Sequence, residues 1–254
     1  MITIISPAKT QDFDSAIPTK IEQTPLLYPN EANELMEHLQ HLSTEEIGKL
    51  MKISPALSRL NYERYQTFQH PEAPVRQAIF AYMGDVYDGL QAKELSAKAL
   101  RFAQNHLRIV SGLYGMLRPL DGIRPYRLEM AIKLENDKGK TLYDFWKTKL
   151  TQQIDQELQE GNNVLVNLTS DEYWKAIDKK ALNKNVRIII PQFKEQRGNE
   201  YKMITLYAKQ ARGMMTRFIM EHQIDNPELI KDFNLAGYGY SEELSTEEKW
   251  VFVR

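Results

Sequence analysis

Three arginines lie close together in the stretch SGLYGMLRPLDGIRPYRLEM, residues 111–130. Proline fixes its own φ and restricts the residue before it, so Arg118 and Arg124, each followed by proline, are held on stiff backbone. With Arg127 they offer planar guanidinium groups whose donors match the oxygens of phosphate. The stretch therefore predicts a phosphate-binding cluster.

Two tyrosines in the same stretch allow two interpretations. Tyr114 and Tyr126 are able to stack on a nucleobase held beside the arginines. In the structural alternative both tyrosines belong to the core, and the arginines pair with Asp121 and Glu129. The residues alone leave both interpretations open.

A second group of cations lies in YAKQARGMMTRFIMEH, where a helix is expected over 207–222. At 100° per residue one face carries Lys209, Arg212, Gly213 and Thr216, and the opposite face carries Ala211, Met215, Phe218 and His222. We therefore expect a basic face and a packed face, with Arg217 as a further cation. Glycine within a helix costs about 1 kcal/mol relative to alanine, so Gly213 indicates close approach of a ligand or of another helix.

Two segments place polar residues directly after expected strands, where ligands bind in sheets flanked by helices. SPAKT follows the first strand, and its Lys9 could contact phosphate or form a nucleophilic pair with Ser6. NLTSDEYWKAI follows a later strand and brings Asp171, Glu172 and Lys175. Ordinary turn chemistry explains the Ser-Pro pair, and acidic residues suit the positive end of a helix.

The segment IGKLMKISPALSRL, residues 47–60, predicts two short helices joined by a tight turn. Ser43 with Glu46 forms a capping box, and Ser54 precedes Pro55 as the cap of the second helix. We expect a helix-hairpin-helix-like element near residues 43–66. In such modules the turn amides bind phosphate, and the contacts here would be Lys52, Ser54 and Arg59. The turn lacks the usual glycines, and a purely structural hairpin is the alternative.

The remaining pattern predicts an α+β fold with a mixed β-sheet surrounded by helices, forming a single domain over residues 1–254. No regular strand-helix-strand repetition is present. Strands are expected at 1–6, 78–82, 107–111, 163–168, 186–190, 200–206 and 249–253. Helices are expected from residue 30, at 97–106, 141–160, 170–176 and 207–222.

Composition excludes several classes of protein. The 254 residues are 42% hydrophobic and contain no cysteine, which removes disulfide frameworks, thiolate catalysis and sulfur-ligated metals. No apolar run approaches a membrane span, and the N-terminus lacks a signal peptide, so we expect a cytoplasmic protein. His38 and His41 lack the partners of a metal site, and neither a P-loop nor a GxGxxG fingerprint is present. We expect no metal and no cofactor.

Charge is distributed unevenly along a chain whose net charge is −1. Residues 1–47 hold two Lys and Arg against eight Asp and Glu, and residues 218–248 hold one against eight. Residues 173–217 hold eleven against three. This asymmetry favours a positive cleft on an acidic body, or else a solvated basic surface.

Taken together, several of these motifs resemble one known family. SPAKT, GDVYDGL at 84–90, the arginine-proline stretch, NLTSDEYWKAI and YAKQARGMMTRFI occur in the order seen in the YaaA family of bacterial peroxide stress proteins. The resemblance implies a DNA-binding protein that limits oxidative DNA damage, with a mixed fold, a helix-hairpin-helix and a positive cleft. Carried onto this chain, the cleft cations would be Lys9, Arg118, Arg124, Arg127, Lys175, Lys209, Arg212 and Arg217.

Two functions from different classes are consistent with these residues. The first is binding of double-stranded or distorted DNA through phosphate contacts, with no membrane association and no obligate protein partner. The second is an enzyme acting on a nucleotide or damaged base in the same cleft, for which the chemistry would come from Ser6, Lys9, Asp171, Glu172 and Tyr126.

Overall fold

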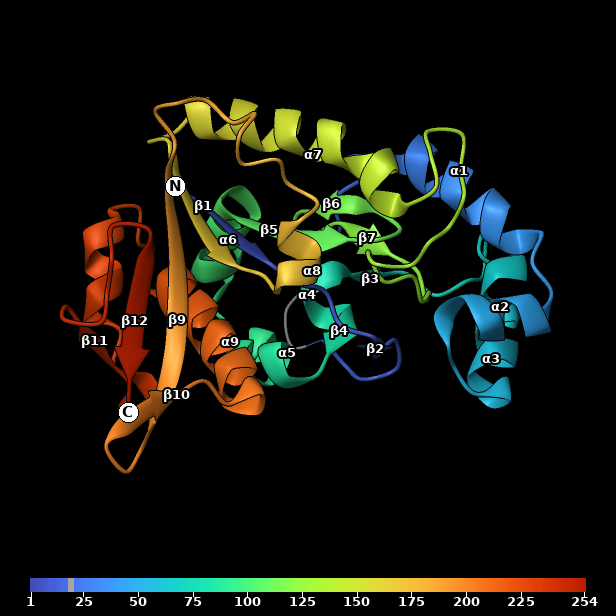
Figure 1. Ribbon diagram of the computed structural model, residues 1–254. Coiled ribbons are helices and arrows are strands. Elements are labelled where there is room, and N and C mark those ends of the chain that lie inside the picture. Colours follow the sequence, from blue (N-terminus) through green and yellow to red (C-terminus); the bar gives the residue numbers. More distant parts are fainter. Residues whose placement is uncertain (18–20) are drawn as a thin grey trace.

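A computed structural model of the protein describes residues 1–17 and 21–254. Its main feature is an eight-stranded mixed sheet, which confirms the expected α+β class. Seven strands follow one another across the sheet, and β10 (Glu200–Lys202) pairs with β9 alone (Figure 1). In spatial order the seven are β11 (Gly239–Ser241), β12 (Lys249–Val253), β9 (Arg187–Arg197), β8 (Val164–Leu168), β1 (Ile2–Ile5), β5 (Leu107–Ser111) and β6 (Gly115–Leu117).

Three neighbouring strands form the centre of the sheet. β1 lies parallel to β8 on one side and to β5 on the other, and every residue of the three is buried. Continuous apolar runs such as ITII are typical of parallel strands covered on both faces. The pairing of Ile5 with Leu168 aligns the carboxyl ends of β1 and β8.

Helices cover both faces of these strands. The long helix α7 (Leu142–Gln159) lies on one face, and α6 (Ala97–His106) and α9 (Thr205–Glu221) lie on the other (Figure 1). The remaining helical segments are α1 (Pro29–Gln40), α2 (Thr44–Met51), α3 (Pro55–Gln66), α4 (Ala78–Ala81), α5 (Asp85–Leu90), α8 (Asp171–Trp174) and the short 3₁₀ turns Ala92–Glu94, Pro227–Asp232 and Leu235–Gly237. Two small antiparallel pairs complete the fold, β2 (Thr10–Gln11) with β4 (Tyr82–Met83) and β3 (Arg76–Gln77) with β7 (Gly122–Ile123).

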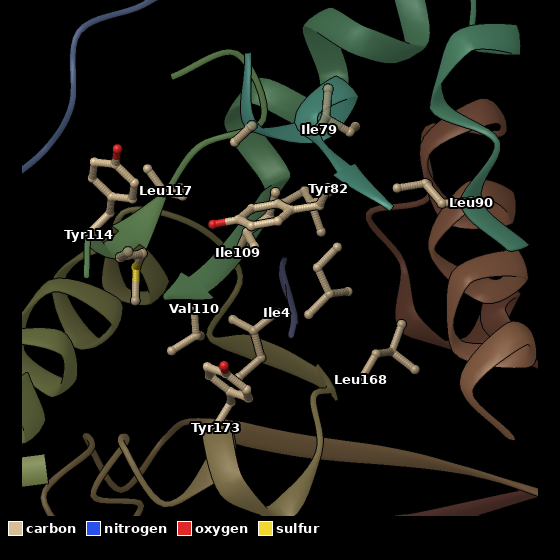
Figure 2. Packing of buried hydrophobic residues seen from close by; sticks show 14 of the residues in the cluster. Ile4, Ile79, Tyr82, Leu90, Ile109, Val110, Tyr114, Leu117, Leu168 and Tyr173 are labelled. Atoms are coloured by element: carbon tan, nitrogen blue, oxygen red, sulfur yellow. The ribbon is translucent and has the colours of Figure 1, made fainter. Parts of the chain in front are cut away.

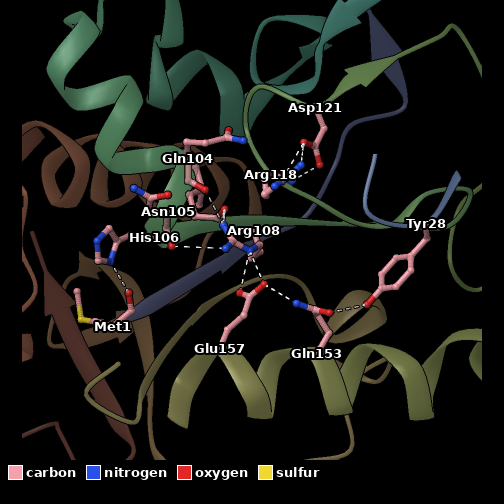
Figure 3. Close-up of polar contacts among 11 residues, drawn as sticks. Met1, Tyr28, Gln104, Asn105, His106, Arg108, Arg118, Asp121, Gln153 and Glu157 are labelled. Atoms are coloured by element: carbon pink, nitrogen blue, oxygen red, sulfur yellow. Dashed lines mark hydrogen bonds and ion pairs between the residues drawn. The ribbon is translucent and has the colours of Figure 1, made fainter. Parts of the chain in front are cut away.

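The core is continuous from the sheet to the helices. Tyr82, Ile109, Ile4 and Tyr173 gather within it beside the central strands (Figure 2). On the α7 side a buried ion pair joins the layers, because Arg108 of β5 donates from Nε to Glu157 of α7 at 2.9 Å (Figure 3).

Helix caps follow the sequence signals closely. Ser43 and Glu46 form the expected capping box at α2, and the Ser54 hydroxyl accepts the Leu57 amide at the start of α3. These contacts satisfy amides that have no partner inside the helix. The boundaries of both helices were therefore predicted well.

Two expected strands were wrong in part. Residues 78–81 form the short helix α4, because a short apolar run that is buried on all sides carries no period to separate strand from helix. The strand expected at 200–206 ends at Lys202, and α9 already begins at Thr205.

Candidate functional site

A cleft opens at the carboxyl ends of β1 and β8. Along the chain, β1 is followed in the large sheet by β5, which lies on the side of β1 away from β8, and β8 is followed by β9, which lies on the side of β8 away from β1. Connections that leave two neighbouring parallel strands in opposite directions create a crevice between them, where α/β sheets bind ligands. Ser6 and Ser170 meet there, with the Ser170 amide donating to the Ser6 hydroxyl at 2.9 Å.

The cleft has a volume of about 450 Å³ and collects segments that are far apart in the chain. Around the end of β1 lie β2, β4, α5, α8 and α9 (Figure 1). The lining comes from residues 6–11, 83–87, 126–129, 170, 172 and 173, together with Lys209 and Arg212 of α9.

Charged side chains of both signs line this cleft. Four of the predicted cations meet here: Lys9, Arg127, Lys209 and Arg212. Three carboxylates accompany them: Asp85, Glu129 and Glu172. The lining therefore carries one more positive than negative charge.

Ion pairs hold three of the four cations. Glu129 Oε1 lies 2.8 Å from Arg127 Nη2 and 3.3 Å from Lys9 Nζ. On the opposite wall Lys209 Nζ lies 3.2 Å from Asp85. An ammonium group has three donors, and the side chains of Lys9 and Lys209 are 65% and 48% exposed. Both lysines therefore retain donors for a ligand.

Arg212 differs from the other three cations. Its half-buried side chain has no ion pair or hydrogen bond within residues 1–17 and 21–254. Burial lowers the pKa of Arg212, and the charge of Asp171 partly opposes that shift. A guanidinium remains ionised in proteins, so Arg212 presents a charge that lacks a partner of its own.

Two glycines bring α9 to the cleft. A Cβ on Gly213 would lie 1.8 Å from the Val86 carbonyl oxygen, and one on Gly89 would lie 2.1 Å from that of Gln210. Only hydrogen fits at either point, so α5 and α9 pack backbone to backbone. This contact brings Asp85 of α5 within 3.2 Å of Lys209 of α9.

The expected basic face of this helix was wrong in part. Gly213 and Thr216 are buried, and the Thr216 hydroxyl donates to the Arg212 carbonyl. Of the face proposed from the helical period, Lys209 and Arg212 alone line the cleft. The period could not reveal that α5 packs directly against Gly213.

Tyr126 closes the floor of the cleft. Its hydroxyl lies 2.6 Å from that of Tyr82 and 2.7 Å from that of Ser111, and burial raises the pKa of Tyr126 to about 12. Tyr114 is also buried and meets Tyr126 edge to face. Both tyrosines thus lie in the core, as the structural alternative has it.

Four other predicted cations lie outside the cleft. Arg118 donates to Asp121 at 3.0 Å (Figure 3). It also donates to the Pro25 carbonyl at 2.7 Å. Arg124 donates to the carbonyls of Phe68 and His70, so both arginines brace neighbouring loops. Arg217 pairs with two carboxylates at 2.9 Å. Lys175 is exposed just after α8.

The helical hairpin forms a separate surface. α2 and α3 lie at the far end of the molecule from α9 (Figure 1). Lys52 adopts φ of 53° in the turn, the left-handed conformation that glycine usually supplies. Arg59 is 80% exposed beside Glu63, at 3.5 Å. Lys52, Ser54 and Arg59 therefore all belong to this hairpin and lie away from the cleft.

One charged residue that lines the cleft was missed from the sequence, and two further lining residues, Glu129 and Ser170, were given no ligand-binding role. Asp85 was never singled out, although it lies inside the quoted motif GDVYDGL. Glu129 was considered only as an arginine partner, and Ser170 was given no role in the site. Asp171 begins α8 and lies outside the lining, whereas Glu172 lies in it and accepts a hydrogen bond from the Ala131 amide.

Neither a metal site nor a membrane-spanning helix is found among the described residues. No three histidine or acidic side chains among them are grouped as metal ligands would be. Nor does any of their helices combine the length and apolarity required to cross a bilayer.

Comparison with known proteins identifies the family. The family model for the peroxide stress protein YaaA matches residues 1–244. A protein of Acaryochloris marina called a UPF0246 protein is 46% identical over 256 residues, covering 100% of both chains. UPF0246 proteins of Hahella chejuensis and Idiomarina loihiensis are each 45% identical over 257 residues, covering all of this chain and 99% and 98% of theirs. The chain therefore belongs to the YaaA family of peroxide stress proteins.

Proposed function

We propose that this protein serves the peroxide stress response in the cytoplasm by binding DNA, with phosphate held at the cleft by Lys9, Lys209 and Arg212. Arg212 is the observation that carries this proposal. A charge withdrawn from water without a partner costs free energy, and such groups concentrate at functional sites. A phosphate would supply the missing partner, because the guanidinium fork matches its oxygens.

The lysines support the same assignment from the rim. Lys9 and Lys209 come from segments 200 residues apart and flank the cleft with exposed ammonium groups. Their carboxylate partners leave further donors of both ammonium groups for a ligand. The lining has an excess of one positive charge, so we expect binding through a few defined phosphates and no broad electrostatic coating.

The other predicted cations take different roles in this proposal. Arg118 and Arg124 hold the loops that shape the cleft, through Asp121 and through two backbone carbonyls. We assign the turn of the α2–α3 hairpin, with Lys52, Ser54 and Arg59, to a second phosphate contact at the other end of the molecule. Long duplexes could engage both surfaces, whereas short ones could engage only one.

Catalysis on a nucleotide or base is the competing function. It would rely on Ser6 and Lys9, with Glu172 and Tyr126 as proton donors or acceptors. The Tyr126 hydroxyl is already committed to Tyr82 and Ser111, and Glu172 Oε1 holds the Ala131 amide. These contacts favour binding. Mass spectrometry of oxidised or mismatched oligonucleotides incubated with the protein would detect turnover.

Fluorescence anisotropy with labelled duplexes tests DNA binding. Losing a charged hydrogen bond costs about 1.5–3 kcal/mol, so Arg212→Gln should weaken binding about ten- to a hundredfold. Arg101→Gln is the matched control, because Arg101 is exposed on α6 and does not line the cleft. Equal affinity of Arg212→Gln and the parent protein would reject the cleft as the phosphate site.

A further inference from the structure

We infer that the interior of the cleft binds one unpaired nucleotide, with its phosphate at Arg212 and its base against the inner wall. The inference rests on the proposed function for the assignment of the cleft to nucleic acid. It adds the class of ligand: a single nucleotide, either extruded from a strand or free.

Size excludes a duplex from the interior. The cleft volume of about 450 Å³ falls in the range of roughly 300–1,000 Å³ that holds small molecules. The major groove of duplex DNA is itself about 12 Å wide, so a double helix can only rest on the rim. A nucleotide turned out of the stack is the part of DNA that enters pockets of this kind.

The distribution of side chains matches the two ends of a nucleotide. The rim carries the exposed ammonium groups of Lys9 and Lys209, which suit an anionic phosphate. Inside, the lining includes the buried side chains of Leu128 and Tyr173, which are 3% and 7% exposed. Flat apolar base faces pack against such surfaces.

The inner wall also contains polar atoms without partners. Among the described residues, Arg127 Nε and Glu129 Oε2 are buried and make no hydrogen bond. An unsatisfied buried group is costly, and a donor beside an acceptor complements the polar edge of a base. Both atoms are sealed from water, so a base reaches them only after a neighbouring side chain shifts. The side chain of Lys9 is the one that we expect to shift, because it contacts Glu129 and is 65% exposed.

The floor is stiff enough to define one shape. Tyr126 is held by Tyr82 and Ser111, and its backbone amide donates to the Gln11 side chain at 3.0 Å. The Tyr65 hydroxyl donates to the Arg127 carbonyl. Contacts from four segments thus fix the backbone that carries Arg127, Leu128 and Glu129.

A duplex containing 2-aminopurine opposite a mismatch tests the inference, because this base fluoresces more strongly when it leaves the stack. We expect emission to rise severalfold when the parent protein binds. Ala8→Trp should abolish the rise, since Ala8 is a partly buried lining residue and indole would occupy the interior. Calorimetry with deoxynucleoside monophosphates forms the second arm and should show binding that Ala8→Trp removes.

The outcomes separate this inference from the proposed function. Duplex binding that depends on Arg212, with unchanged emission and no mononucleotide binding, would overturn the inference and leave DNA binding intact. Mononucleotide binding without duplex binding would support the inference as a free-nucleotide site and reject the DNA-binding proposal. A rise in emission that Ala8→Trp leaves unaltered would place the extruded base elsewhere and overturn the inference.

Discussion

Replacing Arg212 with methionine should separate stability from binding. Methionine keeps an unbranched stem as long as that of arginine up to Nε and a similar helix propensity, but it removes the charged end of the guanidinium group. The side chain of Arg212 makes no hydrogen bond or ion pair within the described residues, so the substitution removes a desolvated charge and loses only the attraction of Asp171, which opposes part of the effect of burial. Relief of an unsatisfied polar group is worth about 1–3 kcal/mol when burial is complete. Because Arg212 is only half-buried, we expect a gain of about 1 kcal/mol, at the lower end of that range.

Urea unfolding and a thermal melt measure this gain. For a chain of this size about 1 kcal/mol corresponds to a rise in Tm of about 2–4 °C. Duplex affinity of the same variant should fall, as for Arg212→Gln. Stabilisation together with lost binding is the pattern of a residue retained for function.

Arg108→Met provides the matched control. Arg108 is a buried arginine that does have a carboxylate partner, Glu157, at 2.9 Å. Removing one partner of a buried pair costs about 3–5 kcal/mol, so this variant should be strongly destabilised. If Arg212→Met lost a comparable amount, Arg212 would be a structural residue, and the reasoning that assigns it to a ligand would be refuted.

Three further substitutions test the geometry around the cleft. Gly213→Ala should force α5 from α9, because its Cβ would lie 1.8 Å from the Val86 oxygen, and should lower the free energy of unfolding by several times the roughly 1 kcal/mol that alanine gains in helix propensity. Gly239→Ala is the control and should be nearly neutral in urea unfolding, because a Cβ there would meet nothing within 4 Å. Equal effects of the two substitutions would contradict the packing of α5 on α9. Tyr126→Phe should cost about 1–3 kcal/mol by leaving the buried hydroxyls of Tyr82 and Ser111 without this partner, and an unchanged unfolding midpoint would count against that network. The hydrogen bonds from Ser15 to Asp12, with Arg76 nearby, hold the pKa of Asp12 well below its usual range. Asp12→Asn should therefore have a lower free energy of unfolding than the parent above the ordinary aspartate pKa, and this difference should disappear as pH falls through the folded pKa. A difference in urea unfolding that grew on acidification would contradict the lowered pKa.

Local signals predicted the elements well where the physics is local. Capping by Ser43 and Ser54 depends on residues three positions away, and the buried strand ITII needs only its own composition. The pairing of Arg118 with Asp121, three residues apart, was likewise foreseeable as the structural alternative. Residues 78–81 failed because an apolar run without a period fits either a strand or a helix.

The cleft could be predicted only in part. Placing Ser6 and Lys9 beside Glu172 followed from the rule that parallel strands end at one edge. The inclusion of Asp85 did not, because it depends on two glycines that let α5 touch α9 across more than 100 residues. The position of Arg124 outside the cleft likewise depends on contacts distant in sequence, since the carbonyls that hold it belong to a loop some 55 residues earlier.

The salt dependence of duplex binding tests the central claim most directly. Each neutralised phosphate contributes about −0.9 to the slope of log K against log salt concentration. For a short duplex that engages the cleft alone, three contacts from Lys9, Lys209 and Arg212 predict a slope of about −2.7. Arg212→Gln should reduce its magnitude by about 0.9, whereas Arg101→Gln should leave it unchanged. A slope near zero for the parent protein, or identical slopes for the parent and Arg212→Gln, would contradict phosphate binding at this cleft.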